Sequence, residues 1–483
     1  MKALDTSMKT ALLSFYYCFI LTTVLADTLV VYPTPEGIAS NDSFTVKVRL
    51  PHGQWKDLFC YDVQVDMHKP QQASMACLDF SGLMEVSVTY NRGEIRSTRV
   101  RPLSYGIEPE VNGNTLKFSL SEPRNLSIEV DGDIFRNLHL FASSIETDRP
   151  RPNDPNVIYF GPGIHEPGDN FKIPSGKTVY IAGGAVVKST LVCDHAENVR
   201  ILGRGMLYRP ERGVQITFSK NIEIDGIMVI NPQHYTVFGG QSEGITVRNL
   251  KSFSSRGWSD GIDLMSCSDV LVDGVFMRNS DDCIAVYGHR WDYYGDARNI
   301  TVQNSTLWAD VAHPVNVGTH GNPDSPEVLE NIIFKNIDIL NHDEPQINYQ
   351  GCIALNASDG NLIRNVRVED IRIEDFEQGQ LLNLRVMFNR KYAKAPGRGI
   401  ESVLFKNVTY NGKNANISIV SGYNEQRAIR NIVFENLRIN GNLIWDRMPG
   451  KLGHLATSDM ARFYVGEHVE GLEFRADTDA MAR

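Results

Sequence analysis

Four aspartates lie close together in two short stretches of the chain, and their spacing suggests acid–base chemistry. Asp260 and Asp263 occur in Ser-Asp-Gly-Ile-Asp-Leu, and the adjacent pair Asp281 and Asp282 occurs in Asn-Ser-Asp-Asp-Cys-Ile-Ala. Carboxylates held together repel one another, which raises the pKa of at least one of them. One carboxyl is then protonated near neutral pH while the others stay ionised. Hydrolysis of a glycosidic bond needs this division, because one group donates a proton to the leaving oxygen and another activates water.

A turn position is the ordinary alternative for any one of these residues. Asp225, Asp269 and Asp273 follow or precede apolar strands in the same way, and aspartate is favoured in turns. Two adjacent acids before an apolar strand have no capping role, so we interpret the Asp281–Asp282 pair as functional.

The elements that must position these acids are strands of a repeating scaffold. From about Asn198 a phrase such as Lys-Asn-Ile-Glu-Ile-Asp-Gly recurs nine times at intervals of 23 to 37 residues, with apolar residues at alternate positions and then Asn, Asp or Gly. Alternation at period two predicts strands, the polar residues predict turns, and the repetition predicts a solenoid. We expect an all-β chain whose main domain is a right-handed parallel β-helix, because helical repeats and four-stranded blades are absent.

Stacked coils explain how separated acids could meet. Asp260 and Asp281 are 21 residues apart, close to one coil, and neighbouring strands of a sheet lie about 4.8 Å apart. Because successive strand residues face opposite sides, Asp281 and Asp282 can share a face only where the backbone bends at a bulge or corner.

The sequence predicts three segments. Residues 1–26 are interpreted as a signal peptide, since lysines precede an apolar run that ends in small residues, and the protein is therefore expected to be secreted. Residues 27–147 contain short alternating strands without the repeat, and predict a small antiparallel β-sandwich. This domain could bind carbohydrate or cap the solenoid's open end, and we expect the cap. A Pro-rich linker precedes the β-helix domain, residues 157–475. After export, Cys60 and Cys77 could form a disulfide, a question that the sequence leaves open.

Composition restricts the partners. The formal net charge of −10 argues against nucleic acid and anionic membranes, which attract clustered Lys and Arg. Beyond the signal, no segment is apolar enough to span a bilayer. No Cys-x-x-Cys metal pair occurs. We expect a monomer that acts on a polysaccharide or oligosaccharide.

The stretches Ser-Asp-Gly-Ile-Asp-Leu, Ser-Asp-Asp-Cys-Ile-Ala-Val-Tyr-Gly and Ala-His-Pro-Val-Asn-Val-Gly, in this order, resemble motifs of glycoside hydrolase family 28, the polygalacturonase-like enzymes. The resemblance covers roughly residues 157–474. The related dextranase-like family 49 shares the β-helix and an N-terminal β-sandwich, and remains a close relative to consider.

The resemblance implies a role for each matching residue. Asp281 is similar to the general acid, and Asp260 and Asp282 are similar to the pair that activates water. His313 matches a histidine beside the acid, and Asp263 matches a supporting carboxylate. The implied reaction is a single displacement with inversion that uses no metal or organic cofactor.

Three departures from the family pattern concern the substrate. Trp258-Ser259 stands where the family has Asn-Thr, and Ala-His-Pro around His313 stands where it has Gly-His-Gly. The stretch Gly-Cys-Ile-Ala-Leu-Asn-Ala-Ser-Asp-Gly-Asn lacks the Arg-x-Lys that binds a uronate carboxylate in pectinases. We therefore expect a sugar other than galacturonate, or one held by other basic residues. Candidate substitutes are His289, Arg290, Arg385 and Arg390.

A loop after the Asp-Asp strand adds candidate substrate contacts. It contains His289, Arg290, Trp291 and Tyr293, whose rings could stack on a sugar and close one end of the cleft. Closure would favour release from a chain end. His234 lies one coil earlier and could line the same groove.

Two other functions fit parts of the pattern. A polysaccharide lyase on a β-helix would use Ca²⁺ and a basic residue, and the acids here could bind the cation. A carbohydrate-binding or adhesin protein on an inactive scaffold would need no proton donor. The Asp trio without an accompanying base favours the hydrolase over both.

Overall fold

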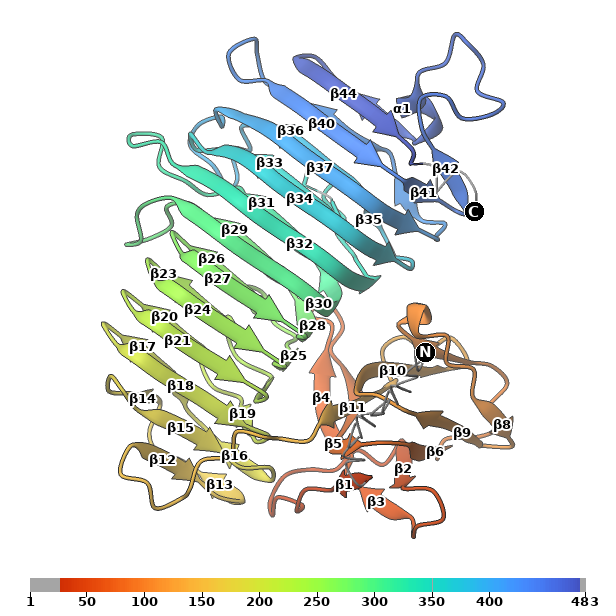
Figure 1. Ribbon diagram of the computed structural model, residues 1–483, viewed down its shortest axis with the longest axis vertical. Helices are drawn as coiled ribbons and strands as arrows, with labels where there is room; N and C mark the ends of the chain where they lie inside the picture. The colour runs from red at the N-terminus through yellow and green to blue at the C-terminus, as the bar shows by residue number, and fades with distance from the viewer. Residues whose placement is uncertain (1–26, 350, 478–483) are drawn as a thin grey trace, which may run out of the picture.

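The computed structural model describes residues 27–349 and 351–477, and the expected signal peptide lies outside the described residues. Parallel strands are wound into a β-helix from β12 to β44, and antiparallel sheets precede it (Figure 1). The predicted all-β fold class is confirmed. In the described part of the chain, no helix has the length and apolarity needed to cross a bilayer.

Two parallel sheets form the coils of the β-helix. The eleven-stranded sheet carries the site described below and consists of β14 (Asn170–Lys172), β17 (Thr190–Asp194), β20 (Val214–Thr217), β23 (Val237–Gly240), β26 (Ile262–Met265), β29 (Ile284–Tyr287), β31 (Val315–Gly318), β33 (Ile353–Ala357), β36 (Leu382–Val386), β39 (Ser418–Ser421) and β43 (Phe463–Val465).

The twenty-stranded sheet forms the rest of the wall. It consists of β12 (Val157–Phe160), β13 (Gly163–His165), β15 (Thr178–Ile181), β16 (Ala185–Val187), β18 (Glu197–Gly203), β19 (Met206–Tyr208), β21 (Lys220–Asp225), β22 (Met228–Ile230), β24 (Glu243–Arg248), β25 (Lys251–Phe253), β27 (Ser268–Asp273), β28 (Phe276–Ser280), β30 (Ala297–Val311), β32 (Val328–Asn341), β34 (Leu362–Ile373), β37 (Gly399–Tyr410), β40 (Ile429–Glu435), β41 (Leu437–Ile439), β42 (Asn442–Ile444) and β44 (Val469–Arg475). A short pair, β35 (Gly379–Gln380) and β38 (Ala415–Asn416), and one helical turn, α1 (Thr457–Met460), lie outside these sheets.

The repeat phrase explains the coils. In β27 the alternate residues Val270 and Val272 are buried in a continuous aliphatic core, while their neighbours face outward. Asparagines within the long strands take the left-handed conformation and stack from coil to coil. Asn336 donates to Asn304 at 2.8 Å, and Asn304 donates to Asp273 at 2.8 Å. These side chains satisfy one another's hydrogen bonds where the strand backbone has a positive φ.

The N-terminal domain consists of two sheets around their own core. One contains β1 (Thr28–Val30), β4 (Tyr61–Val65), β5 (Gln71–Ser81), β7 (Thr98–Arg101), β10 (Arg124–Val130) and β11 (Leu138–Ser144), and the other contains β2 (Phe44–Arg49), β3 (Lys56–Leu58), β6 (Met84–Tyr90), β8 (Glu110–Asn112) and β9 (Thr115–Leu120). A 3₁₀ turn, η1 (Leu103–Tyr105), follows β7. The pairing is antiparallel except between β5 and β11, which run parallel.

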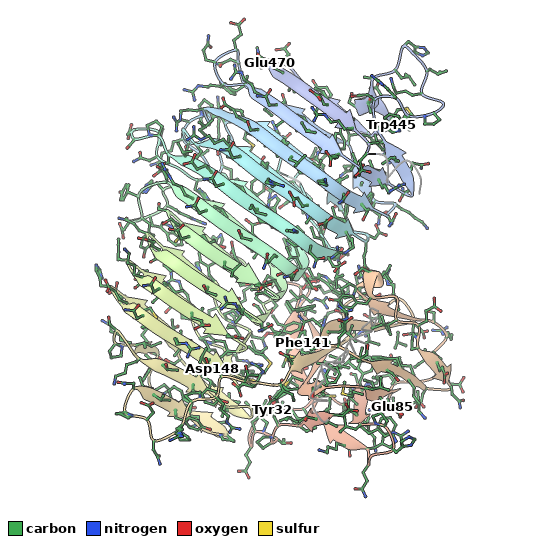
Figure 2. All side chains as sticks on the ribbon, in the orientation of Figure 1. Tyr32, Glu85, Phe141, Asp148, Trp445 and Glu470 are labelled. Carbon is green, nitrogen blue, oxygen red and sulfur yellow. The ribbon has the colours of Figure 1, made fainter. Side chains whose placement is uncertain are left out.

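The expectation that this domain caps the end of the solenoid is wrong. The domain packs against the side of the β-helix, with Phe141 at the junction (Figures 1 and 2). The reason is an outward-facing apolar strip on successive coils, which includes Val186, Met228, Phe276 and Trp308 and requires cover from water.

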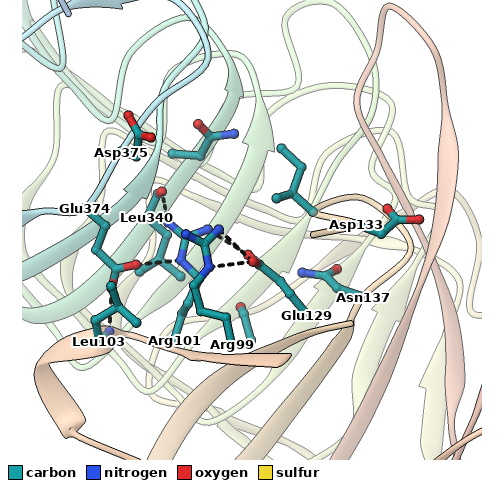
Figure 3. Close-up of polar contacts among 12 residues, drawn as sticks. Arg99, Arg101, Leu103, Glu129, Asp133, Asn137, Leu340, Glu374 and Asp375 are labelled. Carbon is teal, nitrogen blue, oxygen red and sulfur yellow. Dashed lines mark hydrogen bonds and ion pairs between the residues drawn. The ribbon is translucent and has the colours of Figure 1, made fainter. Parts of the chain in front are cut away.

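Buried charges fix the same junction. Arg101 of the N-terminal domain bonds Glu129 at 2.8 Å and Glu374 of the β-helix at 2.6 Å, and it also donates to the carbonyl of Leu340 (Figure 3). Arg204 of the β-helix reaches back to Asp79 at 3.0 Å. Buried charges are costly when one partner moves away, so these pairs favour a single domain arrangement.

The possible disulfide between Cys60 and Cys77 is absent, because all six described cysteines are free. Cys60 faces the core between the two sheets, whereas Cys77 packs toward the β-helix. Side chains on opposite faces of a sheet cannot bridge.

Candidate active site

The strands of the eleven-stranded sheet stack the polar residues in register. Val237, Ile262, Ile284 and Val315 pair across consecutive coils. Two positions before each of them stand Tyr235, Asp260, Asp282 and His313, and backbone hydrogen bonds continue the ladder through this column, for example from Gly261 N to Asp282 O at 2.8 Å. The coil interval at the acids is therefore 22 residues, so Asp282, rather than Asp281, stacks on Asp260.

Asp281 reaches the same site from a corner. Strand β28 ends at Ser280 and β29 begins at Ile284, and the register shifts between Asn279 and Ser280. The backbone bend that two adjacent acids require is thus present. The carboxylate of Asp281 accepts hydrogen bonds from the backbone N–H of Trp258 at 3.0 Å and of Asp282 at 3.1 Å.

Asp282 is held by several donors. His313 Nδ1 lies 2.6 Å and the His313 backbone N–H 3.1 Å from one carboxylate oxygen. Asn316 donates to the other oxygen at 2.7 Å, and the Tyr287 hydroxyl lies 3.3 Å from it. His313 is fully buried, and its second nitrogen faces the carbonyl of Tyr349. The histidine therefore contacts Asp282. The resemblance to family 28 motifs had instead implied a histidine beside the general acid, Asp281.

The two adjacent acids have opposite pKa shifts. Burial, followed by the charge of Asp282, raises the pKa of Asp281 to about 7. Burial also acts to raise the pKa of Asp282, but the His313 cation and the hydrogen bonds outweigh it and lower that pKa. The same ion pair outweighs the burial of His313 and raises its pKa to about 9. Near neutral pH, Asp281 can hold a proton while Asp282 is an anion.

Asp260 and Asp263 complete a buried group of carboxyls. Burial and the neighbouring carboxylates raise the pKa of Asp260 well above its usual value. Burial also raises the pKa of Asp263, against the opposing charge of Arg290, whose Nη1 lies 3.7 Å from Asp263. Arg290 thus partly neutralises the negative charge of the acids.

A cavity of about 450 Å³ opens over these acids, a volume within the range of small-ligand sites. Of the predicted site residues, Asp260, Asp281, Asp282 and Arg290 line the cavity. Asp263 and His313 lie behind its wall and contact lining residues.

The other predicted contacts do not line the cavity. Trp291 stacks on Tyr235, a lining residue, with ring centroids 6.0 Å apart, and His234 packs against the same tyrosine. Tyr293 packs on Phe238, and His289 Nδ1 bonds the Tyr293 carbonyl at 2.7 Å. Trp291 and His234 thus support a lining residue, and Trp291 remains 45% exposed.

Several lining residues were not among the site residues predicted from the sequence. They include Met67 and His68 from the N-terminal domain, Trp258, Tyr287, His320, Gln346, Tyr349, Lys391 and Tyr392. Trp258 stands next to the first acid motif, is 70% exposed and could stack on a sugar ring, so its position could have indicated it. Lys391 lies more than a hundred residues after Asp282, and only the fold brings it near.

The acids could also hold a cation. One carboxylate oxygen from each of Asp260, Asp281 and Asp282 lies within 4.8 Å of the others. Oxygen ligands of this kind suit Ca²⁺ or Mg²⁺. No other group of three such residues occurs in the described ranges. A cation bound here would compete with protons, because its ligands would be the same carboxyls that bind them.

The winding of the chain and the buried acids at one cavity define a β-helix protein with a carboxylate site. A family model described as glycosyl hydrolases family 28 matches residues 206–447, about half of the chain, and includes all four acids. This chain belongs to glycosyl hydrolases family 28.

Individual relatives are distant. A probable exopolygalacturonase B from Aspergillus niger is 24% identical over 290 residues, which cover 55% of this chain and 62% of that protein. A probable endo-xylogalacturonan hydrolase A from Aspergillus fumigatus is 25% identical over 140 residues, 28% of this chain and 32% of that protein. The chain therefore spans less than two thirds of either relative.

Two solved structures share the fold. The family 28 exopolygalacturonase of Yersinia enterocolitica has a TM-score of 0.51 at 11% identity, covering 80% of this chain and 96% of that one. Dex49A from Penicillium minioluteum has a TM-score of 0.55 at 13% identity, covering 90% of this chain and 96% of that one.

Proposed function

We propose that this protein is a secreted, monomeric glycosidase that hydrolyses a polysaccharide or oligosaccharide in the cavity above Asp260, Asp281 and Asp282. The single observation that supports this proposal most strongly is the difference between two adjacent carboxyls. Asp281 has a pKa raised to about 7, whereas hydrogen bonds and His313 keep Asp282 ionised. A proton donor and an anion beside one cavity are the pair that glycoside hydrolysis uses.

In the proposed reaction, Asp281 protonates the leaving oxygen. Asp282, with Asp260 one coil away, takes a proton from the attacking water. His313 orients Asp282 and keeps it charged, and the remaining carboxylate charge stabilises positive charge that develops on the sugar. Arg290 is a positioning residue, because it limits the repulsion among the acids.

The stereochemistry is proposed from the family resemblance, which implies inversion. The distances favour the second candidate for the stereochemistry, which is retention of configuration. Oxygens of the three acids lie within 4.8 Å of one another, closer than the roughly 6.5–9.5 Å between carboxyl groups in most inverting enzymes. Proton NMR of the first anomer released decides between them: inversion requires the configuration opposite to that of the cleaved bond.

The substrate proposal starts from the missing Arg-x-Lys, which favours a neutral sugar. Lys391 provides the strongest reason for an acidic one, because its Nζ, held 3.0 Å from Gln346 Oε1, belongs to a lining residue. Hydrolysis of dextran and polygalacturonate separates the two. If polygalacturonate is the substrate, Lys391→Met should raise its KM at least tenfold, since a paired charge is lost. Preference for dextran would favour the neutral sugar.

The decisive substitution is Asp281→Asn, which keeps the size of the side chain and removes the acidic proton of the carboxyl group. Polysaccharide hydrolysis should fall by about 10²–10⁴-fold, the usual contribution of a general acid. Asp273→Asn is the matched control, because Asp273 ends β27, does not line the cavity and accepts a hydrogen bond from Asn304. Full activity in Asp281→Asn would remove Asp281 from the mechanism.

Removal of metal separates the hydrolase from a lyase. A hydrolase that uses the carboxyls for proton transfer should keep its activity in EDTA and release no unsaturated product. Loss of activity in EDTA, restored by Ca²⁺, together with the ultraviolet absorbance of an unsaturated uronate product, would instead favour the lyase.

A further inference from the structure

The N-terminal domain contributes to the cavity above the acids. Met67 and His68 line this cavity together with Trp258, Asp260 and Asp281. Both belong to residues 66–70, which connect β4 to β5 and are called the β4–β5 turn below. In Figure 1 this hairpin extends from the N-terminal sheets to β28 and β30 of the β-helix. The turn therefore brings a second domain to the catalytic coils.

The β4–β5 turn is fixed to the strand that precedes the proposed acid. The backbone N–H of Asp66 donates to Asp310 Oδ2 at 3.2 Å. Asp310 pairs with Arg278 at 3.0 Å, and both side chains are fully buried. Arg278 lies on β28, three residues before Asp281. A movement of the turn would disturb a buried ion pair next to the acid, which makes the turn a stable wall.

Further contacts from the N-terminal domain hold the same arginine. Arg278 Nη1 lies 3.0 Å from Asn137 Oδ1 and 3.0 Å from His139 Nε2. Just before the turn, the Gln64 backbone N–H donates to Asn231 of the β-helix at 3.1 Å. The hairpin is thus bonded to the β-helix directly beside its turn, while His68 within the turn is exposed.

We propose that the β4–β5 turn forms one wall of a sugar subsite and restricts cleavage to the end of a chain. The proposal rests on the proposed glycosidase function. Gln346, Tyr349 and Tyr392 line the cavity from later coils, so walls from both domains limit its length. The thioether of Met67 can contact the apolar face of a sugar, and the imidazole of His68 can bond a hydroxyl.

The experiment compares Met67→Ala/His68→Ala with Lys69→Ala. Lys69 is an exposed residue of the same turn that does not line the cavity. Wild-type protein and both variants digest dextran and polygalacturonate, and products are sized from the first percent of hydrolysis. We expect wild type and Lys69→Ala to release one short product throughout. The double variant should release a range of oligomers, with at least a tenfold higher KM for the corresponding trisaccharide.

The outcomes separate this proposal from the function on which it rests. Unchanged product sizes and KM in the double variant, or a range of oligomers from wild type, would overturn the proposed wall while leaving hydrolysis intact. Wild type that cleaves neither these polymers nor any other polysaccharide in a wider screen contradicts the proposed function, and the proposed wall is then also rejected. Melting temperatures identify a folding defect, in which case His68→Ala, at an exposed position, replaces the double variant.

Discussion

At the scale of single residues, the site assigns different protonation states to two aspartates that adjoin in sequence. Burial and the negative charge of Asp282 raise the pKa of Asp281 to about 7, against the two backbone N–H bonds that its carboxylate accepts. Asp282 receives the His313 cation and the Asn316 amide, and its pKa is lowered. The sequence indicates the pair, but the partners that distinguish the two acids come from other coils.

The pH dependence of kcat/KM follows from these shifts. Activity should fall as the pH rises through about 7, because Asp281 then loses its proton. It should also fall at low pH, where Asp282 gains one. In His313→Gln the cation that lowers the pKa of Asp282 is gone, so the acid limb should move to higher pH.

The control for this profile is His454→Gln, a substitution of an exposed histidine. It should reproduce the wild-type profile. An acid limb that stays in place in His313→Gln would show that the histidine does not control the charge of Asp282.

Stability should depend on pH through the same carboxyl. The pKa of Asp281 is raised from about 4 in the unfolded chain to about 7 in the folded protein, so its ionisation destabilises the fold as the pH rises through 7. Asp281→Asn should therefore raise the melting temperature relative to wild type at pH 8 and by less at pH 5. A difference that is constant between these pH values would contradict the raised pKa. Asp273→Asn provides the reference for removal of a carboxylate at the end of a strand.

At the scale of elements, the repeat in the sequence predicts the strands and the stacked turn residues, because alternation and turn chemistry are local properties. The register between strands of successive coils is harder to predict from the sequence. The 21-residue interval suggested that Asp281 stacks on Asp260, whereas the pairing of Ile262 with Ile284 places Asp282 there. A shift of one residue changes which acid faces its neighbour, and only the hydrogen-bonded ladder fixes it.

The asparagine stacks make a prediction at this scale. Asn304 has a φ of 52°, donates to Asp273 and accepts from Asn336. Asn304→Ala should lower the free energy of unfolding by about 2 kcal/mol, through lost hydrogen bonds and a strained backbone. Asn304→Gly should lose less, because glycine adopts positive φ without strain. Equal losses in thermal or urea unfolding would show that the backbone conformation contributes little.

At the scale of the whole molecule, the arrangement of the two domains determines the cavity. The N-terminal domain covers an apolar strip on the β-helix, and its hairpin delivers Met67 and His68 to the acids. The sequence predicts two β domains but not their contact, because the strip is made of single residues such as Met228 and Trp308 from separate coils. For the same reason Lys391 and Tyr392 could not be assigned to the cavity in advance.

The buried ion pair at this contact should be sensitive to removal of one partner. Arg278→Met leaves Asp310 buried without its cation and should lower the free energy of unfolding by about 3–5 kcal/mol. Arg298→Met is the matched control, since Arg298 is 45% exposed in its pair with Asp296 and should cost at most about 1 kcal/mol. Similar losses for both in urea unfolding would argue against a fixed junction.

The central claim is that Asp281 supplies a proton to the leaving oxygen, and a substrate that needs no such proton tests it most directly. A dinitrophenyl glycoside of the sugar identified by the polysaccharide assays has a leaving group that departs as an anion. The account predicts that Asp281→Asn loses polysaccharide hydrolysis by about 10²–10⁴-fold and cleaves this glycoside at close to the wild-type rate. Asp282→Asn should lose both activities. Equal loss of both activities in Asp281→Asn would contradict the assignment of Asp281 as the acid.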